Sequence, residues 1–181
     1  MRRSPVYLTY MAVLVTSAVI IHAVEAALPL PMPVPGVRLG LANIITLLAV
    51  VLYGVSAGLL VAVLRTVLGS FFTGGFLGFG FWLALAGGVV SCLVMALALL
   101  LSRRGYISLV SVSVLGAVAH NLTQISVASL IISNLTLLRG YYPLLILLAV
   151  PTGIFTGVAA DYLVDITRRA VYQAGDTGLS R

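Results

Sequence analysis

Residues 39–69 read LGLANIITLLAVVLYGVSAGLLVAVLRTVLG, an apolar run of about thirty residues in which only Arg65 is charged. A helix that crosses a bilayer needs about 20 apolar residues, so this run is too long for one ordinary span. Gly54 follows Tyr53 near its middle, and glycine weakens a helix there. The run therefore predicts two short helices, 40–53 and 55–70. This division decides whether the chain has five helices or six.

The whole chain has the composition of a membrane protein. Of its 181 residues, 61% are hydrophobic and 8% are charged, whereas soluble domains are about 25% charged. So few charges cannot cover a water-facing surface, and we expect lipid around most of the chain. The fold predicted is all-α, a single polytopic membrane bundle over 1–181. Its helices are expected at about 6–27, 40–53, 55–70, 81–101, 106–134 and 142–166, with a polar cytoplasmic tail at 170–181.

The segment after the first helix is rich in proline. Four prolines at alternate positions between 29 and 35 prevent a helix and favour a stiff, extended loop. The chain start, with Arg2 and Arg3 before an apolar stretch, also has features of a signal peptide. Its apolar stretch is longer than the roughly 7–15 residues usual in such peptides, and Glu25 falls where a cleavage motif would lie. We therefore interpret it as an uncleaved first helix.

The arginines favour six helices over five. Cytoplasmic loops of membrane proteins carry an excess of basic residues. With six helices and both termini in the cytoplasm, the outer side holds only Arg38 and Arg139, besides Arg65 in a helix. The inner side then holds Arg2, Arg3, Arg103, Arg104, Arg168, Arg169 and Arg181. Five helices would separate the first pair from the second. This scatter at helix ends argues against nucleic-acid binding despite a net charge of +6, and we expect a multi-pass protein of the inner (plasma) membrane.

Two arginines toward the outer side are candidate ligand-binding residues. A charged side chain at a helix centre costs about 2.5–3.5 kcal/mol on insertion scales. Arg65 lies near the outer end of the helix expected at 55–70, and Ser70 follows it. Arg38 lies just before the helix expected at 40–53, and Asn43 lies near the start of that helix. A pair of guanidinium groups suits a carboxylate or phosphate, so convergence predicts a small-molecule anion site open to the outside. The alternative is that both arginines only reach the lipid headgroups.

The helix expected at 106–134 is the most polar one. His120 and Gln124 are four residues apart and therefore share a face, with Asn121 adjacent. These side chains either line a pocket or form hydrogen bonds between helices, as polar residues often do in membranes. The sequence alone leaves both possibilities open.

The few acidic residues of interest lie in the first and the last predicted helix. His22 lies three residues before Glu25 in the first helix. This pair would serve as a proton relay, or Glu25 would form an ion pair with one of the outer arginines. Asp161 and Asp165 lie near the inner end of the last helix, where we interpret them as part of a cytoplasmic anchor.

Patterns typical of enzymes are missing from the sequence. It contains no catalytic triad, no phosphate-binding loop and no aspartate-rich motif of the kind that holds magnesium and diphosphate in polyprenyl synthases. Neither histidine lies in a cluster of metal ligands. We expect no catalytic residues, no metal and no cofactor in this chain, although a part in an enzyme assembly stays open.

Four segments together resemble a known bacterial membrane family. They are GVRLGLANIITL at 36–47, RTVLGS at 65–70, GGVVS at 87–91 and GAVAHNLTQ at 116–124. They resemble the family labelled heptaprenyl diphosphate synthase component I, also called the Gx transporter family, over roughly residues 5–170. That family is similar in hydrophobic organisation to the substrate-binding S components of energy-coupling factor transporters.

The resemblance implies two different functions. As an S component, the chain would bind a small anionic or amphipathic ligand and would pair with a transmembrane coupling subunit and its ATPases. As component I, it would be a non-catalytic membrane accessory of a soluble prenyl synthase in menaquinone biosynthesis. A purely structural scaffold is a third, weaker reading.

Overall fold

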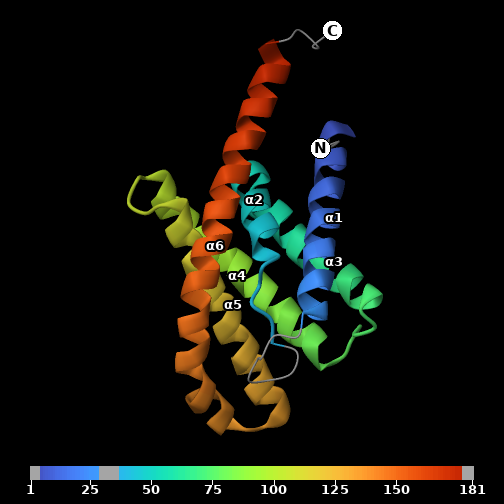
Figure 1. Ribbon diagram of the computed structural model, residues 1–181, viewed down its shortest axis with the longest axis vertical. Coiled ribbons are helices and arrows are strands. Elements are labelled where there is room, and N and C mark those ends of the chain that lie inside the picture. The colour runs from blue at the N-terminus through green and yellow to red at the C-terminus, as the bar shows by residue number, and fades with distance from the viewer. Residues whose placement is uncertain (1–4, 29–36, 177–181) are drawn as a thin grey trace.

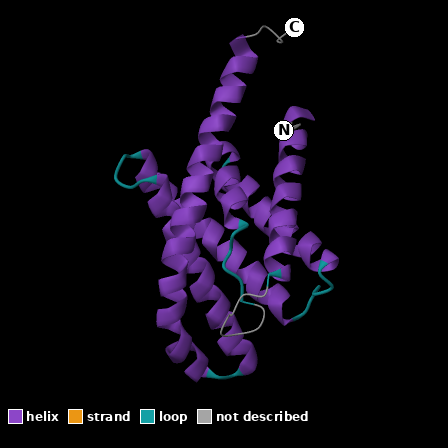
Figure 2. Cartoon of the chain, in the orientation of Figure 1, coloured by secondary structure: helices purple, strands orange, loops and turns teal. Residues whose placement is uncertain are grey.

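In the computed structural model, which describes residues 5–28 and 37–176, every regular element is a helix (Figure 1, Figure 2). The described helices are α1 (Pro5–Ala27), α2 (Asn43–Tyr53), α3 (Val55–Phe72), α4 (Phe79–Arg103), α5 (Leu109–Ile132) and α6 (Leu135–Asp176). The prediction of an all-α bundle of six helices is confirmed for this part of the chain. The proline-rich loop, Arg2, Arg3 and Arg181 lie outside the described residues.

The long apolar run divides at Gly54. This residue has φ 89°, a left-handed conformation that glycine adopts without the strain of a Cβ atom. α3 then packs closely against α2. A Cβ atom on Gly58 would lie 2.2 Å from Cγ2 of Val50, so a larger residue would force the two helices apart.

α2 differs from the other helices in length and position. Its 11 residues extend over about 16 Å, roughly half the hydrocarbon thickness of a bilayer. The other five helices in the described part of the chain are long and apolar enough to cross a membrane. α2 packs against all five of them and is buried along most of its length. It is therefore an internal helix surrounded by membrane-spanning ones.

The two ends of the bundle are distinct, and Figure 1 shows that α1 begins and α6 ends on the same side. We call this side the terminal end. The ring of Tyr7 in α1 lies 5.4 Å from that of Tyr53, which brings the turn between α2 and α3 to the terminal end. Arg103 and Gly54 line one hollow there, so the connection from α4 to α5 lies there too. The opposite side, with the turn from α5 to α6, is the far end.

The boundary between the last two helices differs from the prediction. We expected the last helix to begin at about residue 142, beyond Arg139 and Gly140. This was wrong, because the chain turns at Ser133 and Asn134 and α6 begins at Leu135. Ser133 has φ 55°, and the Asn134 side chain accepts a hydrogen bond of 3.0 Å from the Thr136 amide. Such side-chain bonds to the backbone favour turns over helix, whereas a single glycine costs a helix only about 1 kcal/mol.

Two helix lengths also differ. α6 runs from Leu135 to Asp176 rather than over 142–166, so much of the expected polar tail is helical. Residues 167–176 contain no proline, and half of them (arginine, alanine and glutamine) favour a helix. α5 starts at Leu109 instead of residue 106, because the Ser108 hydroxyl accepts a 3.1 Å hydrogen bond from the Ser111 amide and caps the helix.

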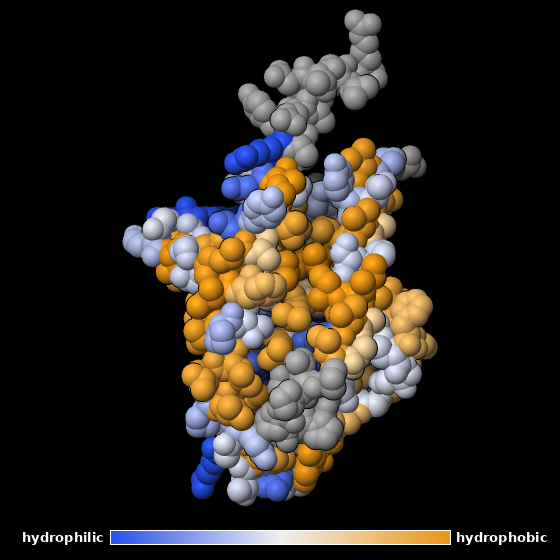
Figure 3. Space-filling model, viewed as in Figure 1, coloured by the Kyte–Doolittle hydropathy of each residue, from blue (hydrophilic) through white to orange (hydrophobic). Residues whose placement is uncertain are grey.

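The exterior of the bundle is apolar. Figure 3 shows hydrophobic side chains over most of the visible face and strongly hydrophilic ones toward the ends. Large apolar residues are exposed on every long helix, among them Leu97, Leu130 and Phe155. A protein with such an apolar exterior would aggregate in water, and lipid is the solvent that suits this surface. The chain is a multi-pass membrane protein.

Candidate ligand-binding site

Residues 37–42, which precede α2, place non-helical backbone inside the far half of the bundle. Such backbone needs hydrogen-bond partners wherever it is removed from water. Gln124 of α5 supplies two, since its Oε1 accepts from the Arg38 amide at 2.8 Å and its Nε2 donates to the Arg38 carbonyl at 2.9 Å. Glu25 of α1 accepts a 2.7 Å hydrogen bond from the Gly40 amide. These two side chains hold segment 37–42 between α1 and α5.

The two arginines predicted to converge do lie in one cluster. Arg65 of α3 is fully enclosed, and its Nη2 donates a 2.8 Å hydrogen bond to Oδ1 of Asn43. The Arg38 guanidinium contacts Nε2 of His22 in α1. Burial lowers the pKa of Arg38, and the nearby carboxylate of Glu25 acts against that shift. The cluster therefore contains two guanidinium groups and a single carboxylate.

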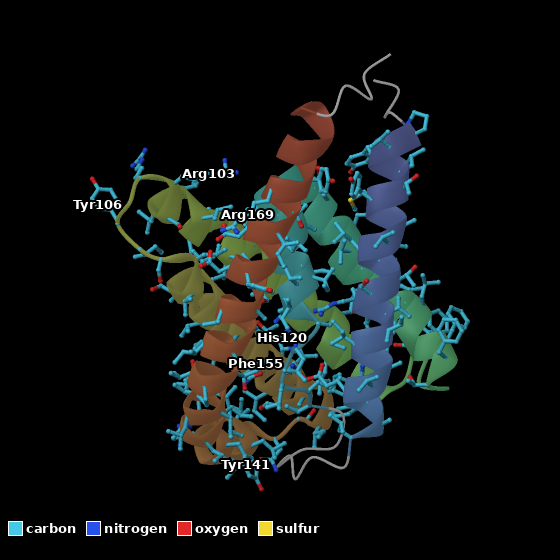
Figure 4. The ribbon with its side chains drawn as sticks, turned by 45° about the horizontal axis from the view of Figure 1, so that its top comes forward. Arg103, Tyr106, His120, Tyr141, Phe155 and Arg169 are labelled. Atoms are coloured by element: carbon cyan, nitrogen blue, oxygen red, sulfur yellow. The ribbon has the colours of Figure 1, made fainter. Side chains whose placement is uncertain are left out.

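A small cavity lies between these groups. Its volume is about 10 Å³, roughly the space of one water molecule. The lining comes from α1, α3, α4, α5 and segment 37–42, and consists of His22, Glu25, Arg38, Gly40, Arg65, Ala84 and His120. Figure 4 shows the labelled His120 inside the bundle among the helices. The structure thus has a closed polar centre that is much too small for an organic ligand without movement of its walls.

Several polar atoms at this centre have no hydrogen-bond partner. They are Nε of Arg65, Nδ2 of Asn43 and the ring nitrogen of His120 that does not face the backbone of Gly87. These side chains are deeply buried, with 2%, 4% and 2% of their surfaces exposed, respectively. An unpaired buried donor or acceptor costs about 1–3 kcal/mol, and most native structures avoid it. Because these atoms lie close together beside one cavity, they suit a bound water molecule or a polar ligand as their missing hydrogen-bond partner.

Three glycines leave space for the polar side chains of the site, because they have no Cβ atom. A Cβ atom on Gly87 of α4 would lie 3.0 Å from the ring of His120 and from Cγ of Gln124. One on Gly40 would lie 2.8 Å from Nδ2 of Asn43, and one on Gly69 would lie 2.5 Å from the His22 ring. Each polar group is thus seated against backbone, which fixes its position tightly.

The structure places the predicted site residues in two groups. Those gathered around the cavity or holding its walls are His22, Glu25, Arg38, Asn43, Arg65, His120 and Gln124. Asn121 instead donates a 3.2 Å hydrogen bond to the Leu145 carbonyl and so links α5 to α6. Ser70 is buried at the end of α3, where its carbonyl accepts from the Gly75 amide. Neither of these two residues lines the cavity.

Three neighbours of the cavity were not among the predicted site residues. They are Gly40, Ala84 and Gly87, which contribute space or backbone rather than a reactive group. The adjacent glycines Gly87 and Gly88 are the sequence signal that could have indicated a close approach at this helix. Glycine in a membrane helix is too common for that signal to identify a site by itself.

Comparison with known proteins agrees with this architecture. A solved structure, described as the S component of a bacterial ECF transporter, is similar over 96% of this chain and 99% of that one, with a TM-score of 0.52 and 19% identity. This likeness establishes the fold. None of the curated proteins matches the sequence. The sequence model of the family described as heptaprenyl diphosphate synthase component I matches residues 14–163. The resemblance noted in the sequence is thus confirmed, and the chain belongs to the heptaprenyl diphosphate synthase component I family.

Proposed function

We propose that this chain is the substrate-binding subunit of a membrane transporter and that it binds a small anionic ligand at the cavity beside segment 37–42. The observation that carries this proposal is the set of unpartnered atoms on Arg65, Asn43 and His120. In a purely structural cluster these groups would bond to one another. An anion between them would satisfy the free donors and balance the excess positive charge.

Charge-assisted hydrogen bonds explain why a ligand would bind here with useful affinity. Bonds to charged groups contribute about 1.5–3 kcal/mol each, and they are stronger where water is excluded. Arg65 has a free Nε and Asn43 a free Nδ2. The side-chain amide oxygen and nitrogen of Gln124 both bond to the Arg38 backbone, so Gln124 acts by holding segment 37–42 in place. An amphipathic ligand would put its anionic group at this centre.

The orientation in the membrane follows from the basic residues. Arg103, Arg104 and Arg169 are exposed at the terminal end, and the positive-inside rule assigns that end to the cytoplasm. The cavity at the far end would then open toward the outside of the inner membrane. The ECF neighbour suggests a transmembrane coupling subunit with ATPases as the partner.

The test is retention of a ligand by the purified protein. The full chain is expressed in bacteria, purified in detergent and analysed by native mass spectrometry, together with Arg65→Met and Arg139→Met. Both variants lose one arginine at the far half of the bundle, but Arg139 is exposed on α6. We expect a small-molecule adduct on the wild type and on Arg139→Met, and none on Arg65→Met.

Equal retention by all three proteins would contradict the proposal, as would the absence of any small-molecule adduct from all of them. A melting curve for each variant distinguishes loss of the site from loss of the fold. Co-purification of a coupling subunit would extend the proposal to the assembly.

The family description favours a second candidate function. A component I would be a membrane accessory to a soluble heptaprenyl diphosphate synthase, without chemistry of its own. This predicts that the chain co-purifies with a prenyl synthase and that its deletion lowers cellular menaquinone. Normal quinone levels in a deletion strain would contradict this second function.

A further inference from the structure

The charge of the cavity lining limits the charge of its ligand. Arg38 and Arg65 contribute two positive charges, and Glu25 contributes at most one negative charge. With both histidines neutral, the lining has at least one uncompensated positive charge. Residues 29–36, PLPMPVPG, contain no charged side chain, so their sequence cannot alter this count. A ligand with one negative charge would leave the buried centre neutral, which is the least costly state away from water.

The free hydrogen-bonding atoms set a second limit. Arg65 Nε and Asn43 Nδ2 are donors only, so they require acceptor atoms on the ligand. A neutral imidazole has one donor and one acceptor. The Gly87 backbone lies within reach of the donor of His120, which leaves the other ring nitrogen as an acceptor without a partner in the described part of the chain. The ligand must therefore offer several acceptors, as a carboxylate does, and also one donor close to them.

The walls set the third limit, which is size. On the side of α4 the lining residue is Ala84, and Gly87 of the same helix packs against His120 and Gln124. A Cβ atom on Gly87 would already touch His120 and Gln124. Since the cavity has room for about one water molecule, even a small or flat head group requires movement of its walls. Segment 37–42 is the non-helical part of these walls, so we expect it to move when the ligand enters.

We infer that the ligand, or the part of it that enters this centre, is a small monoanionic carboxylate with a hydrogen-bond donor next to the carboxylate, such as a hydroxycarboxylate or a carboxylated N–H heterocycle. This inference rests on the proposed function, because it names the substrate class of the same site. It excludes diphosphates as the preferred ligand. Their several negative charges would leave the buried centre strongly negative.

The experiment compares matched probes on the purified full-length protein. Pyrrole-2-carboxylate and furan-2-carboxylate have nearly the same shape and charge, but only the first has a donor beside the carboxylate. Pyrrole-2-carboxamide has the donor without the charge, and pyrophosphate has excess charge. Thermal unfolding is followed as each probe is titrated, because a ligand that binds the folded state raises the melting temperature, and the rise grows with the logarithm of its concentration divided by its Kd.

We expect pyrrole-2-carboxylate to bind at least about fivefold more tightly than furan-2-carboxylate, since an unpaired buried acceptor costs about 1–3 kcal/mol. The carboxamide and pyrophosphate should give no shift. His120→Phe should remove the preference between the first two probes, and Arg139→Met should preserve it. Equal binding of the matched pair, tighter binding of pyrophosphate, or no shift with either carboxylate would overturn the inference.

The outcome for the ligand class can be separated from the outcome for the proposed function. If native mass spectrometry finds an Arg65-dependent adduct while the carboxylates fail, the transporter proposal stands and the class is wrong. If neither an adduct nor a shift is found, both are wrong.

Discussion

The two ends of this bundle treat charge in opposite ways. At the terminal end Arg103, Asp161 and Asp165 border a hollow of about 270 Å³, and all three are exposed. At the far end Arg65 and Glu25 border a cavity of about 10 Å³ and are almost entirely buried. Exposed ion pairs contribute about 0–1 kcal/mol, whereas each buried charge costs several.

This difference separates charges that need no functional explanation from charges that do. The charges of the terminal end are compatible with anchoring in headgroups and water. Those of the far end are maintained against a cost, and some of their donors are still free. The contrast leads to a ranking of substitutions, in which ligand binding and stability respond strongly at the far end and weakly at the terminal end.

Arg65→Met should have the largest effect on binding. The charge-assisted hydrogen bond from the free Nε to the ligand would be lost, which corresponds to about a 10- to 100-fold loss of affinity. The ligand-free protein should lose no more than about 1–3 kcal/mol of stability, because Oδ1 of Asn43 loses its partner while a costly buried charge is removed. Titration of pyrrole-2-carboxylate and a melting curve without ligand measure the two effects. A strong loss of ligand-free stability would show that Arg65 is mainly structural.

Gln124→Leu should give the next largest effect, and on stability rather than directly on binding. The Arg38 amide and carbonyl would both lose their partner, at a cost of about 1–3 kcal/mol for each buried group. Hydrogen exchange should then accelerate at residues 37–42 more than elsewhere. Thr123→Val is the matched control, since that hydroxyl bonds only to the Ala119 carbonyl of its own helix. Comparable exchange in both variants would refute the role of Gln124 in holding the segment.

Gly87→Ala should have an intermediate effect. The added methyl group would press on His120 and Gln124, and overpacking of this kind costs about 1–3 kcal/mol. We expect a lower melting temperature and about tenfold weaker binding of pyrrole-2-carboxylate, because both side chains must shift. Gly140→Ala provides the control, since a Cβ atom there meets nothing within 4 Å and alanine favours a helix. If the two variants behave alike, Gly87 does not position the site.

The sequence predicted much of the fold because its signals were local. Runs of apolar residues, Gly54 and the paired arginines were enough to predict six helices. The turn at Ser133 and Asn134 was missed because a side-chain hydrogen bond decides it, and Gly140 looked like a stronger break than it is. The internal position of α2 was also missed, since its sequence is as apolar as that of a spanning helix.

The site was predictable only in its charged and amide residues. Arg65 and His120 stood out because polar groups are costly in a membrane helix, and Arg38 because it is a second arginine toward the outer side. Which face each of them presents depends on helix rotation, and the sequence does not contain that information. Asn121 lies next to His120 in sequence, but it turns toward α6 and bonds to Leu145. The small residues of the lining have no chemical signal, so the structure had to place them.

Asp165→Asn should have the smallest effect, and it tests the other half of the comparison. Asp165 is exposed at the terminal end, and substitutions on such surfaces usually change stability by less than about 0.5 kcal/mol. Binding of pyrrole-2-carboxylate should be unchanged within error, because the far-end cavity contains no residue of this hollow. Glu25→Gln removes the same charge at the far end and should destabilise segment 37–42. If Asp165→Asn altered binding as much as Glu25→Gln, the two ends would be coupled, and the distinction between anchoring charges and ligand-binding charges would have to be abandoned.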